Sequence, residues 1–95
     1  MIDDRLIKIA NYFGQDRQVD KIIEEMGELQ QALMKYRHEG KGPEHDNYYN
    51  LTEEIADCFI LLNQLLYLFD IEEDVDEQVE YKINRTLDNY FLRYK

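Results

Sequence analysis

The sequence has few of the residues that form disulfides and tight turns. It contains one cysteine, one proline, four glycines and no tryptophan. The single cysteine, Cys58, excludes an internal disulfide, as is typical of proteins from a reducing compartment. With so little glycine and proline, and no regular alternation of apolar and polar residues, the chain does not read as a succession of short strands and turns. An all-α fold is therefore expected.

Positive charge and long apolar runs are also scarce. Lys and Arg number 11 against 21 Asp and Glu, so the formal net charge is −10. Nucleic acids and anionic membranes both bind basic surfaces, so we expect neither as a partner. No apolar run is long enough to cross a bilayer, and the N-terminus lacks the apolar core of a signal peptide, which predicts a cytoplasmic location. An anionic ligand would have to arrive with a cation, such as a divalent metal.

What the sequence does contain is helical periodicity. Its 95 residues, 44% of them hydrophobic, fit one folded domain covering residues 1–95. Asp3 or Asp4 can cap a short first helix that Gly14 ends, and a second helix runs from about 16 to 38. After a polar loop at 39–47, Asn50 and Glu53 resemble a capping box, which predicts a third helix from close to 51, or one turn earlier, to 69. A last helix follows an acidic connection at 70–74 and continues to the C-terminus.

The segment 51–69 is the centre of this arrangement, because it is apolar on two faces. One face carries Leu51, Ile55, Phe59, Leu62, Leu66 and Phe69, and the other carries Glu54, Asp57, Leu61, Leu65 and Leu68. A helix of this kind should be largely buried. One small bundle covers only one of these faces, so we expect a second copy of the chain on the other, in a homodimer or homotetramer.

The last helix carries one apolar stripe that is expected to face inward. Its members are Val75, Val79, Ile83, Leu87, Tyr90, Phe91 and Tyr94. The predicted architecture is a four-helix, bundle-like all-α arrangement of one short and three long helices.

Two pairs of carboxylates lie on successive long helices. The second helix contains Glu24-Glu25-x-x-Glu28, and the third contains Glu53-Glu54-x-x-Asp57. A step of three residues places both members of a pair on one helical face. If the helices pack antiparallel through the loop at 39–47, the pairs meet, and their charges would repel without a cation. Hard divalent ions such as Mg²⁺ or Mn²⁺ prefer oxygen ligands of this kind.

The alternative is that these carboxylates are solvated charges on exposed helix faces. A single Glu-x-x-Glu in an acidic protein recurs by chance and carries little information. Two such pairs, each beside an apolar stripe that leads into the core, favour a common site, because buried carboxylates need a partner.

At these residues the sequence resembles the MazG-type all-α nucleoside-triphosphate pyrophosphohydrolases. Their hallmark is Glu-x-x-Glu on one helix and Glu-x-x-Asp on the next, as in the pairs Glu25/Glu28 and Glu54/Asp57 here. The resemblance extends over about 12–89. It includes an aromatic-glycine lead-in ending in Gln at 12–18, Glu-Glu-x-x-Glu-Leu-x-x-Ala within 21–33, and Glu-Glu-Ile-Ala-Asp at 53–57. The chain has room for one copy of the motif and so resembles the short, single-domain members.

The resemblance implies the all-α NTP pyrophosphatase fold and Mg²⁺-dependent hydrolysis of a nucleoside triphosphate to a monophosphate and pyrophosphate. The implied metal ligands are Glu25, Glu28, Glu54 and Asp57. Glu24, and with less support Glu53, would be a supporting carboxylate or the base for the attacking water. Gln18 and Lys21 would contact the nucleoside or the phosphates, and Lys82 and Arg85 would hold phosphate oxygens.

Three other interpretations remain open at this stage. Lys82 and Arg85 could be an ordinary surface pair, with Arg85 answering Asp88 three residues later. Phosphoribosyl-ATP pyrophosphohydrolases are similar in fold and motif, and a substrate panel would distinguish them. A non-catalytic helical dimer that binds a nucleotide or a protein as a regulator or adaptor would bind metal without releasing pyrophosphate.

Overall fold

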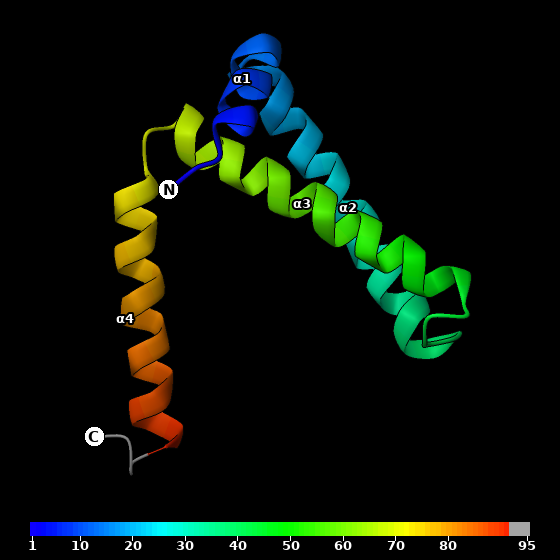
Figure 1. Cartoon of the computed structure of the whole chain (residues 1–95). Helices are drawn as coiled ribbons and strands as arrows, with labels where there is room; N and C mark the ends of the chain where they lie inside the picture. Colours follow the sequence, from blue (N-terminus) through cyan, green and yellow to red (C-terminus); the bar gives the residue numbers. More distant parts are fainter. Residues whose placement is uncertain (92–95) are drawn as a thin grey trace.

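The computed structural model describes residues 1–91, and this part of the chain is helical with no strand (Figure 1). The helices are α1 (Asp4–Phe13), α2 (Gln15–His38), α3 (Asp46–Leu68) and α4 (Glu72–Tyr90). The prediction of an all-α chain with one short and three long helices is therefore confirmed. None of these helices is long and apolar enough to cross a membrane.

Local capping sets the position of α1 relative to α2. The Asp3 side chain accepts a hydrogen bond from the Arg5 backbone N–H at 2.8 Å, as predicted for the N-cap of the first helix. Gly14 separates the two helices with φ of +87°, a conformation that side chains with a Cβ rarely adopt. The chain turns sharply at this point, so α1 folds back against α2 and α3.

The core lies between α2 and α3, which run antiparallel and side by side, with α1 across one end of the pair (Figure 1). Ile22 from α2 packs with Cys58 and Leu61 from α3, and Leu29 and Leu65 pack against this cluster. Ala10 of α1 and Ala32 of α2 are completely buried, because small side chains let the helices approach closely.

Helix α3 differs from the prediction in its start and in its burial. It begins at Asp46, five residues before Leu51, so Asn50 lies inside the helix and forms no capping box. An acidic residue in the first turn favours this earlier start, because it interacts with the positive end of the helix dipole. The expectation that α3 is largely buried is wrong for the single chain. Only Cys58, Leu61 and Gln64 are buried, and Phe59 is 67% exposed.

Helix α4 extends away from the other three (Figure 1). Among the described residues it packs against α3 alone, and none of its residues is buried. The prediction that its apolar stripe faces inward is therefore wrong within one chain: Val79 and Ile83 are about half exposed. Tyr94 lies outside the described residues. The Cα radius of gyration, 16.6 Å, exceeds the roughly 12 Å expected for a compact chain of this length.

Candidate metal centre

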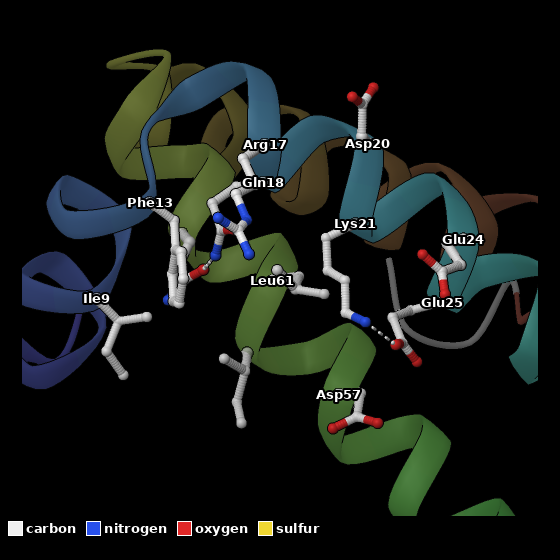
Figure 2. A pocket seen from close by; sticks show the side chains of 12 residues that line it. Ile9, Phe13, Arg17, Gln18, Asp20, Lys21, Glu24, Glu25, Asp57 and Leu61 are labelled. Atoms are coloured by element: carbon white, nitrogen blue, oxygen red, sulfur yellow. Dashed lines mark hydrogen bonds and ion pairs between the residues drawn. The ribbon is translucent and has the colours of Figure 1, made fainter.

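The carboxylate pairs lie on the faces by which α2 and α3 pack together. Glu25 follows the core residue Ile22 by one turn, and Asp57 precedes the core residue Leu61 by one turn. Residues three or four apart share a helical face, so the packing that forms the core also brings Glu25 and Asp57 together. Figure 2 shows these two side chains facing each other from α2 and α3.

Three carboxylates from the two helices converge. Glu25, Glu54 and Asp57 each offer an oxygen within 4.8 Å of the oxygens of the other two. Glu24, Glu25 and Glu28 form a second group with the same spacing, and Glu25 belongs to both. The structure thus places all four sequence-predicted metal ligands in one connected cluster, with Glu25 at its centre.

Two oxygens in this cluster are buried without a hydrogen-bond partner. They are Glu25 Oε2 and Glu54 Oε2. Glu25 is only 5% exposed, and its other oxygen, Oε1, lies 3.1 Å from the ammonium nitrogen of Lys21. A buried acceptor with no donor is costly, so this arrangement calls for a donor or a cation at the two free oxygens.

The carboxylates also disturb one another's ionisation. Burial, together with the proton that Glu54 holds against the Glu25 carboxylate and repulsion from Glu28, raises the pKa of Glu54 to about 7. Burial also tends to raise the pKa of Glu25, but the Lys21 ammonium and the protons on the neighbouring Glu54 and Glu28 carboxyls outweigh it and lower that pKa below the ordinary value. The hydrogen bond to Glu25 raises the pKa of Glu28. Near neutral pH the cluster therefore retains protons that a bound cation would displace.

The donor set fits a hard divalent cation. Every candidate ligand atom is a carboxylate oxygen, which is the type that Mg²⁺ and Mn²⁺ prefer. A cation would also satisfy the two orphaned oxygens and relieve the repulsion that raises the pKa of Glu54. No thiolate or imidazole joins either group of the described residues, so the set does not resemble a zinc site.

A pocket of about 640 Å³ adjoins the cluster (Figure 2). One end is acidic, with Glu24, Glu25 and Asp57. The other end is mainly apolar, with side chains from α1 and α3: Ile9, Phe13, Ile60 and Leu61. Gln18 and Lys21 lie between the two ends, on α2. A pocket with a charged end and an apolar end suits a ligand that also has one charged part and one apolar part.

The structure brings two of the four predicted substrate-binding residues to this pocket, Gln18 and Lys21, but not Lys82 and Arg85. Gln18, Lys21 and Glu24 line it. Lys82 and Arg85 lie on exposed turns of α4, outside the pocket lining, and the Arg85 guanidinium stacks over the Tyr81 ring at 5.6 Å. Because α4 points away from the cluster, one chain does not supply this pair to the site.

Sequence reasoning overlooked residues at the apolar end of the pocket. Phe13 belongs to none of the sequence-predicted sites, and its ring is covered by the Arg17 guanidinium at 4.8 Å. Gln64 was overlooked entirely, although it is completely buried and accepts a hydrogen bond from Gln18. The available signal was an amide within the leucine-rich segment 60–68, since a polar side chain in such a run needs a specific partner.

Comparison of this chain with the models of known protein families, with curated proteins and with solved structures gave no match.

Proposed function

We propose that this protein is a Mg²⁺-dependent nucleotide pyrophosphohydrolase that converts a nucleoside or deoxynucleoside triphosphate into its monophosphate and pyrophosphate. The proposal is carried by the convergence of buried Glu25 with Glu54 and Asp57. One oxygen of Glu25 and one of Glu54 lack partners, and Glu25 and Asp57 line the acidic end of a pocket. The likeness of the two carboxylate motifs to the MazG-type enzymes supports the same reaction.

The residues divide the chemistry between them. Glu25, Glu28, Glu54 and Asp57 would hold Mg²⁺, or Mn²⁺ in its place, which would supply positive charge against the phosphate oxygens. The triphosphate lies with its phosphates at the acidic end of the pocket. Water attacks the α-phosphorus, the bond from that phosphorus to the bridging oxygen breaks, and pyrophosphate leaves.

Glu24 and Lys21 act on the water and on the phosphates. Glu24 lines the pocket beside Glu25, and its exposed carboxylate can be reached by water. We therefore assign Glu24 as the base that accepts the proton from the attacking water. Glu53 is exposed and lies outside the pocket lining, which makes it a weaker candidate for this role. Lys21, now paired with Glu25, supplies a point charge for a phosphate oxygen.

The test is a panel of NTPs and dNTPs incubated with the protein and Mg²⁺, with pyrophosphate and monophosphate measured separately. Equal amounts of the two products, and none after chelation of the metal, are expected. Release of orthophosphate with a diphosphate would contradict the proposed position of bond cleavage. Metal and nucleotide binding without any product would instead indicate a nucleotide-binding regulator.

We also propose that two copies of the chain associate through α3 and α4. The α3 face turned away from α2 exposes large apolar side chains, among them Ile55, Phe59 and Leu62, and α4 exposes Val79 and Ile83. Several large apolar side chains exposed on one helix face are typical of an interface. Association would also be needed to bring Lys82 and Arg85 near a carboxylate cluster, since α4 holds them away from the cluster of their own chain.

The association predicts a specific response to charge. Phe59→Asp or Ile83→Asp should convert the dimer to a monomer in sedimentation velocity, because each places a charge where an apolar contact is needed. Asn84→Asp is the matched control, adding the same charge to α4 without removing an apolar side chain. A monomeric wild-type protein, or an oligomer that tolerates both apolar-to-acid changes, would contradict the proposal.

A further inference from the structure

A chain of buried amides links α1, α2 and α3 beside the pocket. Gln64 is 0% exposed, and its Nε2 donates to the backbone carbonyl of Leu6 at 3.3 Å. Gln18 is 6% exposed, and its Nε2 donates to Gln64 Oε1 at 2.6 Å. Both amides are therefore packed in place at the junction of the three helices.

These hydrogen bonds allow only one orientation of the two amides. A backbone carbonyl accepts hydrogen bonds and cannot donate them, so Gln64 must direct its Nε2 to Leu6 and its Oε1 to Gln18. Gln18 must then direct its Nε2 to Gln64. Reversal of either amide would place two acceptors or two donors against each other.

The consequence is a fixed acceptor on the pocket wall. Gln18 Oε1 makes no hydrogen bond to any residue in the described part of the chain. Gln18 lines the pocket, and Oε1 is the one atom of its amide that the amide pair leaves for a ligand there. An amide that is free to rotate could present either its oxygen or its nitrogen to a ligand. The hydrogen bond to Gln64 occupies the nitrogen of Gln18, so only the oxygen faces a ligand.

The position of this acceptor suits the base of a nucleotide. Gln18 and Glu25 are two turns apart on α2, about 10 Å along the helix axis. A nucleotide with its phosphates at Glu25 therefore extends its base towards Gln18 and the apolar end of the pocket. There the guanidinium of Arg17 over Phe13 offers a flat surface of the kind on which bases stack.

We propose that Gln18, held in one orientation by Gln64, selects nucleotides whose base carries an exocyclic amine, cytosine or adenine, over the corresponding keto bases. This inference rests on the proposed function. The amine donates to Gln18 Oε1, whereas the keto oxygen of uracil or hypoxanthine at the same position opposes one acceptor with another. A polar site that leaves a buried group unpaired discriminates strongly. Gln18 is thus the specificity residue, and Gln64 is a positioning residue that acts through it.

The experiment compares matched substrates that differ in this group, dCTP with dUTP and dATP with dITP. We expect kcat/KM of the wild-type protein to favour the amino base at least tenfold. Gln18→Met removes the acceptor, and Gln64→Met frees the Gln18 amide to rotate, so the ratio should approach one in both. Gln30→Met, an exposed glutamine on α2 outside the pocket lining, is the control and should keep the wild-type ratio. If Gln64→Met fails to fold by circular dichroism, Gln18→Met decides the question.

Binding separates this inference from the proposed function. Calorimetric titration uses the α,β-methylene analogues of dCTP and dUTP with Mg²⁺, which need no turnover, and the dCTP analogue should bind at least tenfold more tightly. Discrimination in binding without hydrolysis would support the base selection and contradict the pyrophosphohydrolase. Hydrolysis with equal kcat/KM for both bases would overturn the selection alone. Failure of both analogues to bind would overturn both.

Discussion

Substitution of Asp57 by asparagine should reduce Mg²⁺-dependent pyrophosphate release by at least about a hundredfold. One oxygen of Asp57 lies within 4.8 Å of oxygens of Glu25 and Glu54, and asparagine keeps the shape of the side chain while removing its charge. Loss of one preorganised electrostatic contact in an active site costs about 10²–10³ in rate. Glu28→Gln should have a similar effect, because Glu28 belongs with Glu25 to the second group of carboxylates that could hold the metal.

Folding and activity can be separated in these variants. Both substitutions reduce the repulsion among crowded carboxylates, so neither should lower the thermal stability of the metal-free protein. Glu77→Gln, which removes one negative charge from an exposed turn of α4 outside the cluster, is the control and should retain full activity. Steady-state kinetics and circular dichroism provide the two measurements. Normal turnover in Asp57→Asn and Glu28→Gln would exclude the carboxylate cluster as the catalytic centre.

The carboxylate cluster could be predicted from sequence because every step towards it is local. The three-residue spacing places Glu25 with Glu28, and Glu54 with Asp57, on single helical faces. A short polar loop then makes α2 and α3 antiparallel neighbours, and the shared core residues set their faces together. Spacing, connection and core position all indicate the same arrangement.

The position of α4 could not be predicted in the same way. Periodicity identifies the apolar face of a helix, but it does not identify the surface that covers this face. Val79 and Ile83 belong to a regular stripe, and the sequence is equally compatible with packing inside one bundle or against a second chain. The turn before α4 includes Asp70 with φ of +55°, which is uncommon for a residue other than glycine and helps direct α4 away from α3.

The hydrogen bond between Gln18 and Gln64 could not be predicted, for a different reason. Gln18 and Gln64 are 46 positions apart, and neither has a spacing that points to the other. A glutamine within a helix is usually exposed, and only the tertiary packing of α1 against α2 and α3 buries both. Long-range polar pairs of this kind depend on the assembled fold.

The metal-free protein should lose stability as the pH rises from about 5 to 7, and Mg²⁺ should restore it. The pKa of Glu54 is about 7 in the folded chain, against the ordinary value of 4.5 in the unfolded chain. Between these values the folded state binds more protons than the unfolded state, so the free energy of unfolding decreases as the pH rises. The raised pKa of Glu28 acts in the same direction. The lowered pKa of Glu25 has the opposite effect, but its contribution is lost only as the pH falls below about 4.5.

Thermal unfolding followed by circular dichroism tests this prediction between pH 5 and pH 8, at one protein concentration. In EDTA the midpoint should fall by roughly 5 °C, the shift that about 1 kcal/mol produces in a domain of this size. Mg²⁺ should raise the midpoint most near pH 7.5, because an ion that binds only the folded state stabilises it and deprotonated Glu54 is its ligand.

Glu54→Gln removes the group that titrates, so it should flatten the pH dependence in EDTA and abolish most of the Mg²⁺ effect. The neighbouring exposed Glu53→Gln should change neither. Suppose instead that Glu54→Gln kept both the decrease of the midpoint with pH and the rise with Mg²⁺. Glu54 would then be neither the carboxylate that titrates near pH 7 nor a ligand, and the metal would have to bind elsewhere.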